Sequence, residues 1–399
     1  MKQSLSNKAL PKIIAAIGFI VVILVGVTFG TFLAFTHPAT EGKVRAGFVY
    51  VGPERDYGWS HAHDIARKSL ETRFDWLETV YVESVSEENT FDKIKYLVEE
   101  EGVEVVFTTS YAHMNGTYEA AKHYSDVMFF NCAGYKRLPN LGTYFADLYQ
   151  IYYLNGMMAG ALTQSGKLGY VGAFKLPEVM RHLNAFHLGA KAVNSSVTTY
   201  VRWLESEWYD PVGARTSAES FISEGVDMLA YTEDSPAVLD VASQFSDVYS
   251  FSHYSPMPLV GGTSTLSGQL VNWEIIYEDI LLKVHTGVYS STNLAEVDYF
   301  WILKEGAVQM GVDFQVPIQP SEEEELKSIF VQDPVLGNIS VRDLIYTRVE
   351  QMSESNVVFE PFTGPITDTG GTVRVASGER LNVESLLSIN WLVKGIVEV

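Results

Sequence analysis

After residue 43, short apolar runs alternate with stretches in which apolar residues recur every three or four positions. The apolar runs suit buried strands, and the periodic stretches predict amphipathic helices. In the first part of the chain we expect strands at 44–51, 78–85, 103–109 and 127–133, and helices at 62–73, 90–101 and 114–124. Strands and helices that alternate through short loops indicate a parallel sheet covered by helices, so the first lobe is predicted to be doubly wound.

The same alternation starts again at a helix over 148–162, which is rich in small residues, and it predicts a second lobe of the same α/β architecture. The expected strands are 167–173, 198–204, 228–231 and 248–252, and the expected helices are 179–194, 213–224 and 237–245. A helix over 269–285 is expected to lead back to the first lobe.

The last part of the chain has a different character. Ser321 and Glu324 have the spacing of a capping box, another helix is expected over 341–352, and turn signals within 359–380 indicate a hairpin. The predicted organisation is lobe 1 at 44–145, lobe 2 at 146–253, a return to lobe 1 at 254–318, and C-terminal helices and a hairpin at 319–399 that complete lobe 2.

An uncharged apolar run from Ile13 to Phe35 precedes this globular part. At roughly 1.5 Å per residue it is long enough to cross a bilayer as a helix. Three lysines lie among residues 1–12, so the positive-inside rule keeps this end in the cytoplasm and places the rest of the chain, after a spacer at 36–43, outside it. The alternative is a cleaved signal peptide, whose apolar region is usually shorter, about 7–15 residues.

Composition narrows the classes of function. The chain of 399 residues has 49 acidic and 28 basic side chains and a net charge of -21, which would repel a phosphate backbone, so no nucleic-acid partner is expected. Hydrophobic residues make up 47% of the chain, enough for two cores. Cys132 is the only cysteine and therefore forms no intrachain disulfide.

The loop after the first expected strand carries the strongest candidate binding residues. Asp56, Trp59 and Ser60 follow that strand and precede a helix. In an open α/β sheet small ligands bind at the carboxyl ends of the strands. An aromatic face beside polar groups suits a flat polar molecule such as a nucleobase.

The loops of the second lobe carry similar residues. Trp208 and Tyr209 could supply a ring from the opposite side of a cleft, and Asp210, Asp234 and Asp147 could accept hydrogen bonds from a ligand. Each of these aspartates could instead cap the helix that follows it, and Trp208 or Tyr209 could instead belong to the core.

Other chemistries have little support in the sequence. His61 and His63 have the spacing of a metal-binding pair, but no second cluster of ligands accompanies them. The sequence has no Gly-x-Ser-x-Gly elbow, and neither phosphate-binding glycine motif follows the first strand. We therefore expect a binding protein with no catalytic residues, no metal and no cofactor.

The motif from Asp56 to His63, followed by Arg67, resembles that of the basic membrane protein family, the solute-binding receptors of nucleoside-type ABC transporters. Further motifs follow in the same order over about residues 44–399: Thr109-Ser110-Tyr111, Gly134-Tyr135-Lys136, 154–160, 166–171, 177–179, 184–186, 208–211, Asp234-Ser235-Pro236, Gly364-Pro365-Ile366, 378–379 and 393–396.

The resemblance implies a type I periplasmic-binding-protein fold, with two lobes joined by three crossings and a purine nucleoside or base held between them. By position it implies Trp59 and Tyr209 as the stacking pair, with Trp208 as the alternate. It also implies polar ligand contacts from Ser60, Asp147, Ser235, His253 and Asn272.

The chain departs from the family in three places. Trp59-Ser60 replaces the usual Phe-Asn pair, and His253-Tyr254 stands where an aspartate for the ribose is expected, which makes a purine base a possible ligand. The third departure is that the apolar helix replaces the lipid-anchor cysteine.

The predicted function is that of a monomeric receptor, held at the cell membrane by its N-terminal helix with the binding lobes outside the cytoplasm. It would deliver a purine nucleoside or base to an ABC permease and its ATPase. The alternatives are a sensor of the same fold that signals to a membrane partner, and an anchored nucleoside hydrolase with paired carboxylates.

Overall fold

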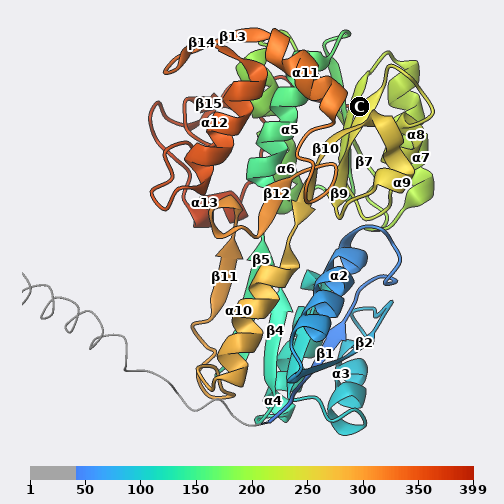
Figure 1. Ribbon diagram of the computed structural model, residues 1–399, viewed down its shortest axis with the longest axis vertical. Coiled ribbons are helices and arrows are strands. Elements are labelled where there is room, and N and C mark those ends of the chain that lie inside the picture. Colours follow the sequence, from blue (N-terminus) through green and yellow to red (C-terminus); the bar gives the residue numbers. More distant parts are fainter. Residues whose placement is uncertain (1–41) are drawn as a thin grey trace, which may run out of the picture.

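The computed structural model describes residues 42–399, which form two lobes one above the other (Figure 1). The predicted anchor at 13–35 lies outside the described residues. Within 42–399, no helix combines the length and apolar character needed to span a bilayer.

Lobe 1 is built on a six-stranded sheet in the order β11-β5-β4-β3-β1-β2, and every neighbouring pair is parallel. Its strands are β1 (Val44–Val49), β2 (Leu77–Val82), β3 (Val105–Thr108), β4 (Met128–Cys132), β5 (Leu141–Ala146) and β11 (Asp298–Trp301). The four predicted strands of this lobe are confirmed, and β5 and β11 were missed.

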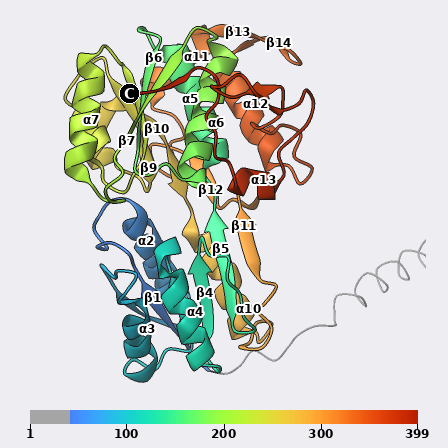
Figure 2. The same ribbon diagram turned by 180° about the vertical axis from the view of Figure 1, so that it is seen from behind.

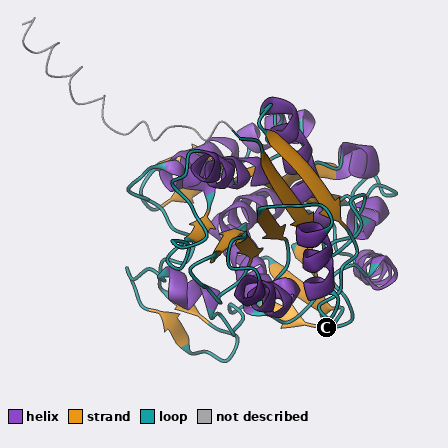
Figure 3. Ribbon diagram, turned by 90° about the horizontal axis from the view of Figure 1, so that it is seen from below, coloured by secondary structure: helices purple, strands orange, loops and turns teal. Residues whose placement is uncertain are grey.

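Helices cover both faces of this sheet, as the alternating pattern predicts. α2 (Trp59–Arg73) packs beside α10 (Trp273–His285) on one face, and α3 (Thr90–Glu99) and α4 (Met114–His123) lie together on the other (Figures 1 and 2). Viewed from below, along the long axis, the helices flank the strands (Figure 3).

Lobe 2 is built on a seven-stranded sheet in the order β12-β10-β9-β8-β6-β7-β17, in which only the β10–β12 pair is antiparallel. Its strands are β6 (Lys167–Gly172), β7 (Thr198–Trp203), β8 (Met228–Thr232), β9 (Tyr249–Tyr254), β10 (Thr265–Val271), β12 (Val308–Met310) and β17 (Ile396–Glu398). α5 (Tyr149–Leu162) precedes these strands, and the helices between them are α6 (Pro177–Val193), α7 (Pro211–Ser223), α8 (Ala237–Ala242) and the single turn α9 (Pro258–Gly261).

The small residues of α5 allow it to lie directly against α6. A Cβ at Gly156 would lie only 2.0 Å from the carbonyl oxygen of Phe186, so the two backbones touch at this glycine.

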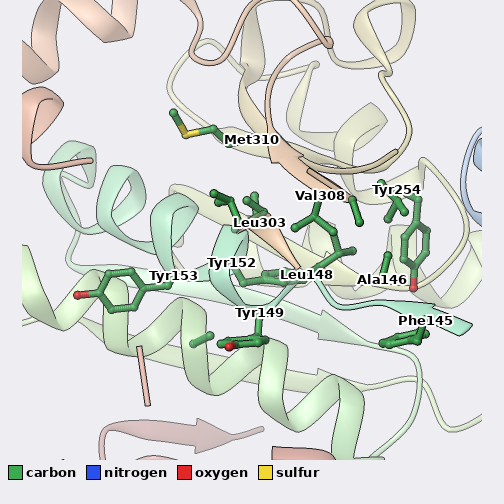
Figure 4. Packing of buried hydrophobic residues seen from close by; sticks show 14 of the residues in the cluster. Phe145, Ala146, Leu148, Tyr149, Tyr152, Tyr153, Tyr254, Leu303, Val308 and Met310 are labelled. Atoms are coloured by element: carbon green, nitrogen blue, oxygen red, sulfur yellow. The ribbon is translucent and has the colours of Figure 1, made fainter. Parts of the chain in front are cut away.

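The chain crosses between the lobes three times, at 147–148, at Asn272 and at 302–307. Residues on or next to these crossings, among them Ala146, Leu148, Leu303 and Val308, belong to one buried cluster that also holds Tyr254 (Figure 4). The hydrophobic core is therefore continuous through the hinge.

Two sequence predictions need correction here. The return to lobe 1 is shorter than 254–318, because β10 pairs with β9 inside the sheet of lobe 2, and Gln269–Val271 are strand rather than helix. The predicted capping box is absent: α11 (Pro320–Ser328) has Gln319 as its N-cap, and the hydroxyl of Ser321 bonds to Glu322 instead.

The C-terminal part packs on lobe 2. It contains the hairpin β13 (Phe330–Asp333) and β14 (Gly337–Ser340), α12 (Val341–Ser353), the hairpin β15 (Ile366–Thr367) and β16 (Val373–Val375), and α13 (Val383–Leu387). The hairpin predicted within 359–380 is confirmed, and the chain ends with β17 at the edge of the lobe 2 sheet.

Candidate functional site

A cavity of about 610 Å³ lies between the two lobes, within the usual size range of small-molecule sites. Segments that follow β3 and β4, together with residues of β5 and β11, form the lobe 1 wall, and the start of α6, the loop after β7 and α13 form the other. The lining residues are Tyr111, Ala112, Ala133, Gly134, Tyr135, Arg137, Tyr144, Phe145, Leu176, Pro177, Glu178, Arg181, Trp208, Asp298, Tyr299, Phe300, Val383 and Leu387.

A smaller cavity of about 50 Å³ lies next to the first, and we call it the inner cavity. Both cavities share Tyr111, Ala133, Phe145, Glu178 and Trp208, while Trp59 and Asp234 line only the inner one. The outer and inner cavities together form the cleft.

Of the two neighbouring aromatic candidates in lobe 2, the structure puts Trp208 in the cleft. Trp208 is half-buried, lies edge-on to Phe174 with 5.3 Å between ring centroids, and lines both cavities. Its carbonyl accepts a hydrogen bond from the Asp234 amide at 2.7 Å, which fixes this loop. Tyr209, which the family resemblance implied as the stacking residue, is 42% exposed and lines neither cavity. Trp208 is therefore better placed to stack on a ligand than Tyr209.

Trp59, the first residue of α2, forms part of the inner wall and is itself held by the core. Its side chain is 8% exposed, and its Nε1 donates a hydrogen bond to the carbonyl of Thr109 at 2.6 Å. Its ring lies edge-on to Trp273 and Tyr254, at centroid distances of 5.3 and 4.8 Å. The indole is therefore oriented before any ligand arrives.

The other two candidates of this loop point into the protein. The carboxylate of Asp56 accepts hydrogen bonds from the amides of Gly58, Ser60 and His61 at 2.8–3.0 Å. Burial raises the pKa of this carboxyl group, although the three hydrogen bonds act to lower it. The Ser60 hydroxyl accepts from the Gly52 amide at 3.0 Å. Neither residue lines the cleft, and the Asp56 carboxylate serves instead as the acceptor for amides in the first turn of α2.

Asp147 is buried beneath the cleft in an ion pair with Arg181, which itself lines the outer cavity. Nε2 of His182 lies 3.3 Å from the carboxylate, and the Tyr149 amide donates to it at 3.1 Å. Burial opposes ionisation of Asp147, but the charge of Arg181 and the contact with His182 outweigh it and hold its pKa well below the usual value. Its charge is thus already paired within the protein.

The four remaining polar candidates line neither cavity of the cleft. The Ser235 hydroxyl donates to Glu233 at 2.9 Å, and His253 is buried with its Nδ1 3.0 Å from Gln269 Nε2. Asn272 lines a separate cavity of about 280 Å³ between α2, α10 and lobe 2. Asp210 is the N-cap of α7 and accepts from the Gly213 amide at 2.9 Å.

The histidines that suggested a metal pair are held by other contacts. His63 is stacked on Trp273 at 4.2 Å, and its Nδ1 lies 2.6 Å from the Tyr277 hydroxyl. His61 Nδ1 bonds to the carbonyl of Glu54 at 2.9 Å. Over residues 42–399 no cluster of three or more histidine, cysteine or acidic side chains could hold a metal ion.

Sequence reasoning missed much of the outer cavity. Tyr111 and Tyr135 are exposed at its rim with ring centroids 6.2 Å apart, and Arg137 pairs with Asp298 at 2.5 Å on the same wall. Glu178 could have been found, because it follows a proline at the start of a helix just after a buried strand, the same kind of position as Trp59.

The two lobes touch through the loop that precedes α2, and we call this contact the latch. The Ser255 hydroxyl donates to the carbonyl of Tyr57 at 2.5 Å, and Gly58 lies against the backbone of Asp234. Tyr57 and Tyr254 have φ values of 62° and 63°, a left-handed conformation that is costly for aromatic residues. Asp234 and Tyr254, which lie at the latch, also line the inner cavity.

Replacing Gly58 with alanine is expected to weaken ligand binding by tenfold or more, because the new Cβ would lie 2.2 Å from the carbonyl oxygen of Asp234 and would hold the lobes apart. Since the lobes themselves are untouched, the melting temperature of the free protein should stay the same. Titration calorimetry and small-angle scattering would measure affinity and closure.

The matched control is Gly42→Ala, because a Cβ at Gly42 has no atom within 4 Å. Unchanged affinity in Gly58→Ala would mean that the latch is not part of the bound state.

Two α/β lobes joined by three crossings, with an aromatic cleft between them, define a two-lobed solute-binding protein. The sequence confirms this class: residues 43–353 match the Bmp family model, described as ABC transporter substrate-binding protein PnrA-like. The chain belongs to this family, a family of solute-binding receptors rather than enzymes.

Two relatives of this chain have names that refer to different ligands. A putative ABC transporter glucose-binding protein of Haloferax volcanii is 34% identical over 73% of this chain and 71% of its own length. A purine-binding protein of Brucella abortus is 31% identical over 89% of this chain and 93% of its own. A solved ABC transporter solute-binding protein from Conexibacter woesei superposes with a TM-score of 0.61 at 16% identity over 79% of this chain and all of that one, which supports the fold.

Proposed function

We propose that this receptor binds a purine base or nucleoside in the cleft between its lobes. The observation that carries the proposal is the inner cavity, where Trp59 and Trp208 supply aromatic surface beside the carboxyl groups of Asp234 and Glu178. Aromatic rings stack on planar bases, and carboxyl groups accept hydrogen bonds from ring and amino N–H groups. The purine-binding relative, which aligns with nearly the whole chain, supports the same ligand class.

Titration calorimetry of the full-length protein with adenine, guanine, adenosine, guanosine, inosine and glucose tests this proposal. A saturable heat from at least one purine and none from glucose supports it. Heat from glucose alone would assign the site to the ligand in the name of the Haloferax relative, and no heat from any compound would overturn the ligand proposal.

The place of the protein in the cell is a further part of the proposal. The apolar run at 13–35 would hold it at the cell membrane with the cleft outside the cytoplasm, and the receptor would pass its ligand to an ABC permease and ATPase. Membrane fractions that retain the protein after alkaline washing, and its digestion by protease added to intact cells, would support this location. Loss of purine uptake on deletion of the gene would separate transport from sensing.

A further inference from the structure

Glu178 occupies the point where the inner and outer cavities meet. It is the second residue of α6, half-buried, and one of the five residues that line both cavities. Within residues 42–399 no hydrogen bond or ion pair is formed by its carboxyl group. A carboxyl group that is partly removed from water and has no internal partner leaves its hydrogen-bonding capacity to the ligand.

The nearest cation is not free to neutralise Glu178. Arg181, one turn further along α6, bonds to Asp147 and to the carbonyl of Leu386 at 2.8 Å. Burial raises the pKa of Glu178 to about 7; the charge of Arg181 opposes the rise and that of Asp147 adds to it. The other titratable groups that interact with Glu178 are Cys132, Tyr170, Asp234 and Tyr254.

We propose that Glu178 reads the hydrogen-bonding edge of the ligand, and that this edge carries an amino group beside a ring nitrogen, as in adenine and guanine. The inference rests on the proposed function and narrows its ligand class to aminopurines. Neither relative's name nor the family description assigns a role to this residue.

The chemistry follows from the two forms of a carboxyl group. The neutral acid donates its O–H and accepts with its other oxygen, so it matches adenine, which offers a ring nitrogen acceptor beside an amino donor. The ionised form only accepts, so it matches guanine, which offers a ring N–H and an amino group. One side chain thus reads both bases, each in a different protonation state.

This gives a dependence on pH of opposite sign for the two bases. Adenine binds the protonated form, so its affinity should fall as pH rises through about 7. Guanine binds the ionised form, so its affinity should fall as pH drops through the same value. With a pKa near 7, each population changes roughly tenfold between pH 6 and pH 8, so the ratio of the two affinities should change about 100-fold.

Glu178→Gln tests the assignment, because glutamine keeps the shape of the neutral acid with one donor and one acceptor and does not titrate. We expect the variant to keep adenine binding within about threefold at pH 6, to lose guanine binding by at least tenfold at pH 8, and to lose the pH dependence of both. Calorimetry of the full-length protein with each base and its nucleoside at pH 6 and pH 8 measures all of this.

Glu360→Gln is the matched control. Glu360 is also buried with its pKa raised to about 7, but it bonds to the Tyr149 hydroxyl at 2.9 Å and lines neither cavity of the cleft. This variant should keep the wild-type pattern, and thermal melts check that both variants fold.

The outcomes separate the inference from the proposed function. Purine binding that does not depend on pH, or a Glu178→Gln variant that keeps the wild-type pH dependence, would overturn the inference and leave the purine receptor standing. The same holds if Asp234→Asn, rather than Glu178→Gln, removes the dependence. Absence of binding by every purine would overturn both.

Discussion

Replacing Trp208 with alanine is expected to weaken purine binding roughly 5- to 150-fold, because base–aromatic stacking is worth about 1–3 kcal/mol per base by alanine substitution. Trp208 lines both cavities and is held by its loop, so its ring is available to a ligand with little ordering cost. Calorimetry with the tightest purine measures the change, and a thermal melt checks that the half-buried side chain is not needed for folding.

The neighbouring residue supplies the control. Tyr209 belongs to the same loop and is also aromatic, but it lines neither cavity, so Tyr209→Ala should bind purines as the wild type does. The reverse result, with Tyr209→Ala impaired and Trp208→Ala unchanged, would restore the stacking pair of Trp59 and Tyr209 implied by the family resemblance. It would also mean that this loop changes conformation on ligand binding, so that Tyr209 enters the cleft.

The largest effect on stability is expected from Asp147→Asn. The substitution leaves the buried guanidinium of Arg181 without its counterion, and breaking a buried pair in this way costs about 3–5 kcal/mol. The free energy of unfolding from urea titration measures the loss. Because the pKa of Asp147 is lowered by folding, its contribution is present above the unfolded value of about 3.9 and disappears as pH falls through the folded value. The gap between wild type and variant should therefore close in acid.

Two further variants make this prediction specific. Asp147→Asn combined with Arg181→Met removes both charges and should recover much of the lost stability, since no unpaired charge stays buried. Asp298→Asn breaks the ion pair between Asp298 and Arg137, whose side chains are 53% and 32% exposed, respectively. This substitution should cost at most about 1 kcal/mol. Equal losses in Asp147→Asn and Asp298→Asn would contradict the view that burial sets the cost.

The alternation of apolar runs and periodic stretches was enough to predict two parallel lobes, but it failed at β10. All seven residues of that strand are buried although three of them, at alternate positions, are polar, so β10 lacks the continuous apolar run by which the other buried strands were predicted. Two of those side chains have distant partners: Ser267 donates to the carbonyl of Pro317 at 2.6 Å, and Gln269 accepts from Asn155 at 2.7 Å. A local sequence pattern cannot predict hydrogen-bond partners that lie 50 or more residues away along the chain.

The candidate site was predicted in outline only. The loops were correct, since Trp59, Trp208 and Asp234 all line the inner cavity. Which side chain of a loop faces the cleft depends on backbone geometry that the sequence does not display, such as the positive φ of 55° at Glu205, three residues before Trp208. The carboxylate of Asp56 accepts hydrogen bonds from amides at the start of α2 rather than facing the cleft, because those amides have no acceptor within the helix.

The family model ends at residue 353, but lobe 2 does not. β17 lies parallel to β7 at the edge of the sheet, and α13 places Val383 and Leu387 on the cavity wall. A protein shortened to the family limits would therefore expose β7 as an unpaired edge, which invites strand addition from other molecules and aggregation. Affinity tags and truncations intended for functional work belong at the other end of the chain.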